Sequence, residues 1–594
     1  MATISTKDDS RIFTIKKFLG LNESTDGDTQ LKMGEASVLR NFEITSEYHL
    51  RVRPGYNVLH AFSGPVRGMW HGYVAGGEVT VCAADNAVWN ITEDGAENIG
   101  DILDAPTTFF GFGDKLYILN GMEYLVWDGI GYVESVSGYV PVVVTASAPG
   151  GGGTTLEPVN MLTGKRRVRF SADGTSTVYQ LPENDVSSID FVFVEKQEQT
   201  EGFTIDKAAG TVTFSEAPAQ GSNNVEIFYN VANTLRSKIE KMRYSEFFNG
   251  SSDTRVFLYG DGSNKTYYCG VTEDGEASAE YFPDLYEMQV GTVNTPITSM
   301  SRHYSKLLVF KPEAVYATSY SAITLEDGST TAGFYTVPIH REIGNEAPGQ
   351  VQLVNNYPRS ICAGNIFEWR LATTLYADER NAKNISDRVQ QSMTRADAKK
   401  IFTFDNNMTH EYFVFLNDAE GTVLVNNYEN NTWYMYTGLP AVCGCTDGDA
   451  VYFGFSDGRI VIFGHDYMTD DGESIQSRYE SGNMSFNADF KRKTSSIIWI
   501  SMKPAVNARI MVSARSDKKS DYAEKEVASS LSGFGGANFA HWSFLTNRSP
   551  QIERIKLKVK KFVYYKIIIT SGSMAGDVTV LGIDQKVRYT GNVK

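Results

Sequence analysis

The sequence predicts a mainly β protein built around a β-propeller of five to seven blades, with a small inserted β-sandwich and a C-terminal β-domain. Composition is the first reason: 53 Gly, 32 Tyr and 33 Phe against 17 Pro are typical of aromatic strands joined by tight turns. The second reason is that apolar hairpins recur at irregular intervals, often roughly 40 to 60 residues apart. Because one four-stranded blade cannot bury both of its faces, such repeats stack radially in a propeller.

Length and hydropathy bound the class of protein. At 594 residues the chain is too long for one ordinary domain, and 42% hydrophobic with 21% charged residues excludes a mostly disordered one. No stretch approaches 18 uncharged apolar residues, and the first twenty residues lack an apolar signal core. We therefore expect a soluble chain without stable membrane insertion.

The places where the hairpins fall divide the chain into five segments. We expect an N-terminal arm with the first strands at 1–65, the first part of the propeller at 66–140, an inserted β-sandwich at 141–232, the rest of the propeller at 233–480 and a basic C-terminal β-domain at 481–594. The clearest hairpins lie at 113–129, 255–268, 305–317, 410–426 and 450–463, and a sixth is expected at 361–375.

Two changes of pattern set the insert and the C-terminal domain apart from the propeller. The run at 146–153 has the composition of a flexible linker, and alternating strands follow it from 167 to 229. A short helix is expected at 234–242, where the chain returns to the propeller. After about residue 470 the hairpin spacing ends, and further apolar strands predict a separate β-domain.

The formal net charge of −16 hides an asymmetry. Residues 491–594 hold 19 Lys and Arg against 7 Asp and Glu, a net of +12, so the remainder carries −28. Part of this excess lies in one predicted strand, where the basic residues alternate with aliphatic ones and so share one face: Arg554, Lys556, Lys558 and Lys560. That face is either a solvated surface or a contact with an acidic neighbour, which would be another subunit or nucleic acid.

Signatures of chemistry are missing from the sequence. The eight His form no metal-binding spacing, and no Gly-x-Ser-x-Gly elbow is present. The five Cys are too scattered for a disulfide framework or a zinc site, so we expect them to be reduced packing residues. We therefore predict no catalytic, cofactor-binding or metal-binding residue, no cofactor, and a protein that is not an enzyme.

The most specific motifs lie in the N-terminal segment. Phe18-Leu19-Gly20-Leu21-Asn22 is followed by Gly34-Glu35-Ala36, Leu39-Arg40-Asn41-Phe42 and Leu50-Arg51-Val52-Arg53-Pro54-Gly55-Tyr56. Together with the hairpin at 113–129 and the run from Glu342-Ile343-Gly344 to Ile385-Ser386-Asp387-Arg388-Val389, this segment resembles the tail nozzle (tail tubular B-like) and packaged-DNA-stabilising proteins of short-tailed bacteriophages. The resemblance covers the arm and the propeller.

The resemblance implies a structural virion protein of the phage tail, assembled in the host cytoplasm. In such tails a ring of subunits, usually six, lies below the portal and adaptor and contacts other tail proteins. The ring encloses a channel through which double-stranded DNA passes without sequence-specific binding, and an acidic lumen would repel the phosphate backbone. On this reading an arm that orders on assembly carries the candidate assembly contacts Arg51, Arg53, Pro54 and Tyr56.

Two other functions stay open. A tail-associated propeller that binds or cleaves glycans would bring acids and Arg residues together in a central pocket, and Arg341, Arg359 and Arg370 lie in one segment of the predicted propeller. A propeller scaffold unrelated to viruses would be a monomer with one exposed binding face.

Overall fold

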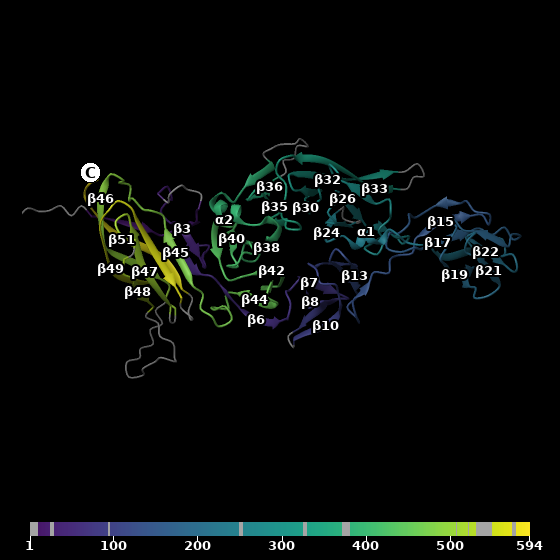
Figure 1. Cartoon of the computed structure of the whole chain (residues 1–594), viewed down its shortest axis with the longest axis horizontal. Coiled ribbons are helices and arrows are strands. Elements are labelled where there is room, and N and C mark those ends of the chain that lie inside the picture. Colours follow the sequence, from purple (N-terminus) through teal and green to yellow (C-terminus); the bar gives the residue numbers. More distant parts are fainter. Residues whose placement is uncertain are drawn as a thin grey trace, which may run out of the picture. The chain divides into compact units, whose positions relative to one another are not determined.

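The computed structural model describes residues 10–23, 29–92, 95–248, 254–324, 330–370, 381–505, 508–520, 522–529, 549–572 and 578–593. The chain forms two compact units. The first comprises Met1–Met69, Gln352–Arg370 and Ala382–Lys594, and the second comprises Trp70–Val351 and Leu371–Asn381. Strands dominate both units (Figure 1).

In its described residues the second unit contains four antiparallel four-stranded sheets. The first two are β7 (Gly68–Val74), β8 (Gly77–Ala84), β9 (Ala87–Thr92) and β10 (Gly95–Asp101), then β11 (Thr108–Phe112), β12 (Lys115–Leu119), β13 (Tyr124–Trp127) and β14 (Glu134–Ser135). The third is β24 (Tyr244–Phe248), β25 (Arg255–Tyr259), β26 (Lys265–Tyr268) and β29 (Glu287–Gln289), with the hairpin β27 (Gly270–Val271) and β28 (Ala277–Ser278) inserted. The fourth is β30 (Ser299–His303), β31 (Lys306–Lys311), β32 (Ala314–Thr324) and β33 (Thr330–His340).

Successive sheets of this unit share apolar cores, as the blades of a propeller do. The first and second sheets bury Val81, Val88, Leu116 and Ile118 in one cluster. Further clusters join the second sheet to the third and the third to the fourth. Face-to-face packing of this kind explains why β12, β25 and β31 consist mostly of buried apolar residues.

The segment between β14 and β24 forms a small sandwich within the second unit. Its larger sheet contains β15 (Val142–Ser147), β16 (Thr154–Thr155), β17 (Lys165–Phe170), β19 (Ser188–Val194), β20 (Gln197–Glu198) and β23 (Val225–Asn230). The smaller sheet contains β18 (Val178–Gln180), β21 (Phe203–Asp206) and β22 (Thr211–Phe214). Their facing side chains form one core cluster, and helix α1 (Arg236–Glu240) follows the sandwich.

The first unit holds three more runs of four antiparallel strands in the part that is described. They are β34 (Gln352–Val354), β35 (Tyr357–Cys362), β36 (Asn365–Trp369) and β37 (Ala382–Asn384); β38 (Phe402–Asn406), β39 (Glu411–Phe415), β40 (Val423–Asn427) and β41 (Thr432–Tyr436); and β42 (Ala441–Asp447), β43 (Ala450–Phe455), β44 (Arg459–Gly464) and β6 (Gly55–Ala61). The short helices η2 (Asp387–Val389), α2 (Gln390–Arg395) and η3 (Ala398–Lys400) follow β37.

Two larger sheets complete the first unit. One continues from β38–β41 through β3 (Glu35–Arg40) to β45 (Ser477–Ser481), β50 (Tyr565–Ser571), β47 (Arg509–Ser516) and β48 (Lys525–Ala528), with β2 (Gly20–Leu21) paired to β3. The other has the order β4 (Phe42–Ile44), β5 (Leu50–Val52), β51 (Thr579–Asn592), β46 (Lys491–Met502) and β49 (Gln551–Phe562), with β1 (Ser10–Ile15) paired to β51.

These sheets confirm the predicted fold class: a mainly β protein with the four-stranded antiparallel sheets of a propeller, an inserted sandwich and a C-terminal β-domain. Every predicted hairpin is a pair of adjacent strands, except that residues 371–375 of the sixth lie outside the described part. No helix in the described ranges is long and apolar enough to span a bilayer.

The N-terminal segment contains the first strands of the chain, and they pair with strands far along the sequence. From Ser10 onward its described strands pair within the chain: β1 and β5 with β51, β3 with β45, and β6 with β44. Each of those partners would otherwise expose an edge of unpaired N–H and C=O groups. The described part of this segment thus covers strand edges of the same chain.

Candidate functional site

The Arg-Pro-Gly-Tyr turn lies inside the first unit. Arg53 is 3% exposed. Its Nε donates to Asn41 Oδ1 (3.0 Å), Nη1 donates to the Pro54 carbonyl (2.8 Å) and Asp470 Oδ1 (2.9 Å), and Nη2 donates to the Thr437 carbonyl (2.9 Å) and Asp470 Oδ2 (2.6 Å). All five guanidinium donors therefore have an acceptor, in the bidentate geometry that Arg favours with carboxylates.

The residues after Arg53 are packed just as closely. Pro54 is buried, and a Cβ on Gly55 would lie 2.1 Å from the Thr469 carbonyl oxygen. Tyr56 is 5% exposed and accepts a hydrogen bond from Arg459 Nη1 (3.3 Å). Within this chain Arg53, Pro54 and Tyr56 are therefore buried residues with internal contacts, and their role in assembly stays a prediction.

The motifs that resemble the phage proteins meet one another in the first unit. Arg388 of η2 donates from Nη1 to the Leu19 carbonyl (3.2 Å), 369 positions away in the sequence, and its own carbonyl accepts from the Glu23 N–H (2.7 Å). Its Nη2 also lies 3.8 Å from Glu35 Oε1, a carboxylate that is 3% exposed. These contacts hold three separate motif segments together. We call them the joint around Arg388, and its members are Leu19, Glu23, Glu35 and Arg388.

Gly20 shows why this joint demands its sequence. Its φ of +84° is in the left-handed region, and a Cβ there would lie 2.6 Å from the Trp433 carbonyl oxygen. Trp433, at 1% exposed, donates from its indole to the carbonyl of Ile385 in the second motif segment (3.0 Å). The Gly-Leu-Asn motif therefore serves a close backbone approach to β41.

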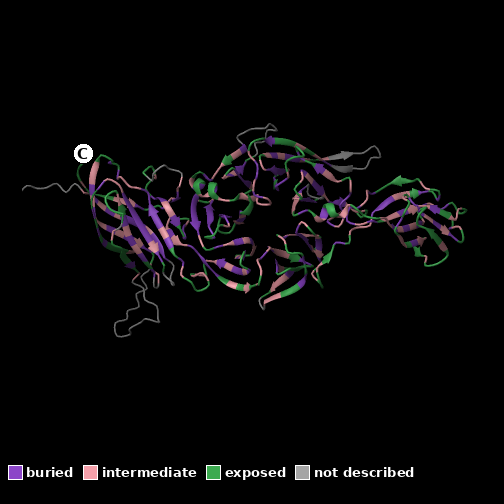
Figure 2. Cartoon of the chain, in the orientation of Figure 1, coloured by how far each residue is buried: buried purple, intermediate pink, exposed green. Residues whose placement is uncertain are grey.

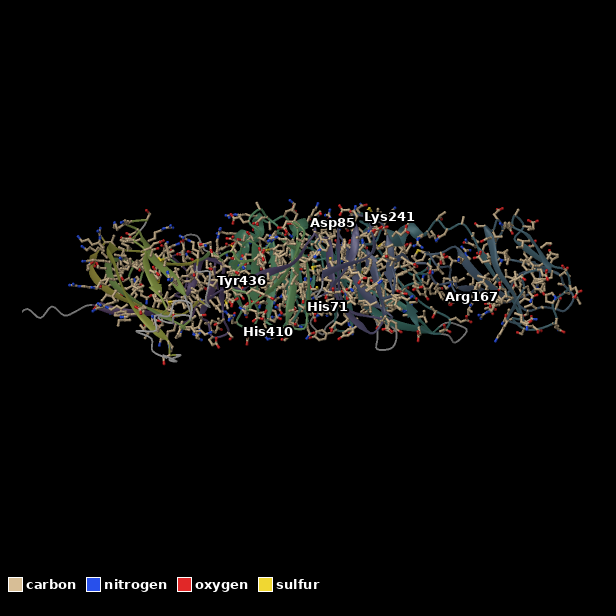
Figure 3. All side chains as sticks on the ribbon, turned by 90° about the horizontal axis from the view of Figure 1, so that it is seen from below. His71, Asp85, Arg167, Lys241, His410 and Tyr436 are labelled. Carbon is tan, nitrogen blue, oxygen red and sulfur yellow. The ribbon has the colours of Figure 1, made fainter. Side chains whose placement is uncertain are left out.

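Arg51, the remaining predicted contact residue, lines a cavity of about 680 Å³ in the first unit. Its Nε donates to Glu43 Oε1 (2.5 Å), and its Nη2 lies 3.0 Å from His465 Nε2. Glu43 is 3% exposed and also accepts from Tyr436 Oη (3.1 Å). Figure 3 labels Tyr436, together with His410, which lines the same cavity.

A second buried carboxyl, Glu411 of β39, lines this cavity. It accepts hydrogen bonds from Tyr434 Oη and from Thr409 Oγ1, the latter at 2.8 Å. Burial, and after it the negative charge of Glu43, raises the pKa of Glu411 to about 7. Glu411 can therefore hold a proton near neutral pH, and Glu43, at the same cavity, is ion-paired to Arg51.

Sequence reasoning missed Glu43 and Glu411. The available signal was one acid in otherwise apolar strands, Phe42–Ile44 and Glu411–Phe415. The Arg residues that were singled out lie elsewhere: Arg359 and Arg370 both bind Glu368 of β36, at 3.3 and 2.7 Å. They form no pocket with these two acids among the residues described.

The basic strand appears as its alternation predicts. In β49, Ile555, Leu557 and Val559 are buried, and the four basic residues between and beside them are exposed: Arg554, Lys556, Lys558 and Lys560. Figure 2 shows this alternation of buried and exposed positions along the strands of the first unit. β49 is the last strand of its sheet, so its far edge has no strand partner in the described chain.

Apolar side chains lie among these cations on the outer side of the sheet. Across the sheet, Lys556 faces Ile497, which in turn faces Lys586 of β51, and Lys586 faces Ile12 of β1. In the next row Arg554 faces the half-buried Trp499. Residues opposite one another in antiparallel strands point the same way, so these rows form one mixed surface.

No protein-family model and no curated protein sequence matches the chain. Similar solved structures include the computationally designed Ika8 protein, at 9% identity over 69% of this chain and 99% of that one with a TM-score of 0.33, and BamB from Moraxella catarrhalis, at 9% identity over 76% and 98% with a TM-score of 0.30. An exo-β-1,3-galactanase from Phanerochaete chrysosporium matches at 10% identity over 57% and 95%, with a TM-score of 0.20. Similarity at this level concerns the fold alone.

Proposed function

We propose that the chain is a structural subunit of a short-tailed bacteriophage tail, forming a nozzle or hub ring that retains packaged DNA and lines the channel for its ejection. The observation that supports this best is the joint around Arg388. The segments that carry the resemblance touch one another there, although 369 positions separate Arg388 from Leu19. These segments therefore belong to one structural element of the first unit.

The continuous sheet of the first unit suits such a subunit. Backbone pairing runs without a break from β38, in a blade-like run, through β3 and on to β48 in the C-terminal domain. The N-terminal segment also supplies β6, the fourth strand beside β44. Strand pairing by the N-terminal segment stabilises the first unit, which suits a subunit that must keep its shape while double-stranded DNA passes along it.

The overall charge fits the passage of DNA. Each chain carries −16, so a ring of six would carry about −96. An acidic channel wall offers few cation–phosphate contacts, and DNA moving along it releases few counterions.

The test is the mass of purified chain by light scattering, alone and mixed with the portal–adaptor complex of the same phage. The proposal expects the complex to gain several copies of the chain. A chain that stays monomeric and indifferent to the complex would overturn it.

A second candidate is a tail protein that cleaves glycans, favoured by the meeting of Glu43, Arg51 and Glu411 at one cavity. Glycosidases pair a protonated carboxyl with an ionised one, and the two environments here differ in that sense. The test is release of reducing ends from the host's surface polysaccharide by the native chain and by Glu411→Gln. Release that the substitution abolishes would support this candidate, and no release by the native chain would eliminate it.

A further inference from the structure

The cations of β49 are not used inside the described chain. Among the described residues no ion pair or side-chain hydrogen bond engages Arg554, Lys556, Lys558 or Lys560, and the exposed Arg588 of β51 is likewise unpaired. Exposed apolar groups accompany them: Ile12 and Ile552 are each 63% exposed. We call this outer surface of β1, β51, β46 and β49 the basic sheet face.

Charge of the opposite sign is concentrated in the first two sheets of the second unit. Residues 70–140 contain 11 Asp and Glu but a single Lys or Arg. That one cation, Lys115, is already paired with Glu280 at 2.6 Å. Eight of the acids are exposed: Glu78, Asp85, Glu97, Asp101, Asp104, Asp114, Asp128 and Glu134.

Four of the eleven acids gather at one end of these two sheets. The Ile102 N–H donates to the Asn86 carbonyl (2.9 Å) and the Leu103 N–H to Glu123 Oε2 (2.8 Å), so three connecting loops are held together. We call their surface the acidic end; its acids are Asp85, Asp101, Asp104 and Glu123. Figure 3 shows Asp85 at the edge of the second unit opposite His71.

The acidic end also presents apolar side chains. Leu103 is 50% exposed and Met122 is 46% exposed. At its margin Arg243 lies against Gly121, where a Cβ would meet its Nε at 2.7 Å. The acidic end therefore combines negative charge with exposed apolar groups.

We propose that the basic sheet face of one copy binds the acidic end of a second copy of this chain. The two surfaces are complementary in charge, and each adds exposed aliphatic side chains that would lose contact with water on binding. A contact between two different patches is heterologous, so repeated copies form a closed ring or an open chain and not a two-fold dimer. This inference rests on the proposed function, because in a phage tail the contact would repeat around a closed ring of copies.

A second copy suits the basic sheet face better than nucleic acid does. Outside residues 491–594 the chain carries −28, so a long duplex on the basic sheet face would be repelled wherever it came close to the rest of the chain. The same negative charge draws the basic face of another copy toward the acidic end. At physiological salt the attraction acts over about 8 Å, which requires direct apposition of the two surfaces.

The experiment is sedimentation velocity of the full chain at low and high salt, with charge-reversal variants. One variant carries Lys556→Glu and Lys558→Glu, and the other carries Asp101→Lys and Asp104→Lys. Matched controls reverse exposed charges in the inserted sandwich, Lys196→Glu with Lys207→Glu and Glu198→Lys with Glu201→Lys. Circular dichroism and unfolding midpoints establish that each variant is folded.

The proposal expects the native chain to associate at 50 mM salt, with association at least about tenfold weaker at 500 mM. Each reversal variant alone should lose association to a similar degree. An equimolar mixture of the two should recover association as alternating copies, because the native acidic end of one variant pairs with the native basic sheet face of the other, and the two reversed surfaces pair with each other. The control variants should behave as the native chain does.

Three results would overturn the contact. A native chain that is monomeric at low salt excludes it, as does association that the reversals leave unchanged. Binding of double-stranded DNA that Lys556→Glu with Lys558→Glu abolishes, without any effect on association, would assign the face to nucleic acid. The proposed function survives each of these results if the portal–adaptor complex still gains mass, so the two failures are distinguishable.

Discussion

Arg53 and the four cations of β49, all in the first unit, lie in opposite environments. Arg53 is enclosed, and its five donors all bind acceptors within the chain. Arg554 and the three lysines that follow it on β49 are exposed and bind none among the described residues. Both lie in short alternating runs of basic residues, Arg51-Val52-Arg53 and Arg554 to Lys560, yet Arg53 is bound within the fold and the β49 cations are exposed.

The difference lies in what the rest of the chain places beside each group. Asp470, Asn41 and Thr437 converge on Arg53 from loops and strands far apart in sequence. β49 is an edge strand, and only its aliphatic side faces a core. A buried cation with complete partners is a structural residue, whereas an exposed row of cations contributes little to folding and much to an external field.

The largest expected effect comes from Arg53→Met, which keeps much of the side-chain volume but removes the charge and donors. It leaves the partly buried Asp470 carboxylate without its bidentate partner and removes one of the hydrogen bonds to Asn41, so we expect the free energy of unfolding to fall by about 3–5 kcal/mol. Urea unfolding followed by tryptophan fluorescence measures this. Arg554→Met is the matched control, and an equal loss in both variants would refute the contrast.

The next effect is pH dependence at Glu411. Its raised pKa of about 7, against an ordinary 4.5, means that the folded state holds this proton more tightly than the unfolded chain does. The contribution of Glu411 to stability is therefore fully present below about pH 4.5 and is lost as the pH rises toward 7. Glu411→Gln should flatten the decline between pH 5 and 8 and raise stability at pH 8 by roughly 1–3 kcal/mol.

Urea unfolding of both proteins at several pH values provides the measurement for Glu411→Gln. Burial also raises the pKa of Asp405, to about 6, so part of the decline should persist in the variant. Glu420→Gln, at an exposed position, is the matched control and should leave the profile unchanged. Parallel profiles for Glu411→Gln and the native chain would contradict the assignment.

A smaller loss is expected from Gly20→Ala in the joint near Arg388. The left-handed φ of +84° and the approach to the Trp433 carbonyl disfavour any side chain, and we expect a loss of about 1–3 kcal/mol. Gly464→Ala is the control, because a Cβ there meets nothing within 4 Å and its φ is not positive. The two unfolding midpoints should separate, and coincident midpoints would count against the close approach.

The smallest effect on stability should come from the basic sheet face. Lys558→Ala removes an exposed and unpaired charge, so the free energy of unfolding should stay within about 0.5 kcal/mol of the native value. Chemical denaturation measures this as well. A loss as large as that from Arg53→Met would mean that the face contributes to the fold itself.

Sequence patterns of period two predicted the hairpins and the exposed row on β49, because both depend on neighbours close in the chain. The patterns failed where partners are distant. Nothing near Arg53 indicates Asp470, and nothing in β6 indicates that it pairs with β44. Glu43 and Glu411 belong to separate segments, and only tertiary packing brings them to one cavity.

The most direct test of the proposed function is the number of copies bound per portal–adaptor complex, counted by native mass spectrometry. The resemblance to phage nozzle proteins and the tied-together first unit lead us to expect six copies in a closed ring. A complex that binds no copies, under conditions in which the chain is folded, would contradict the proposal that this chain is a tail subunit.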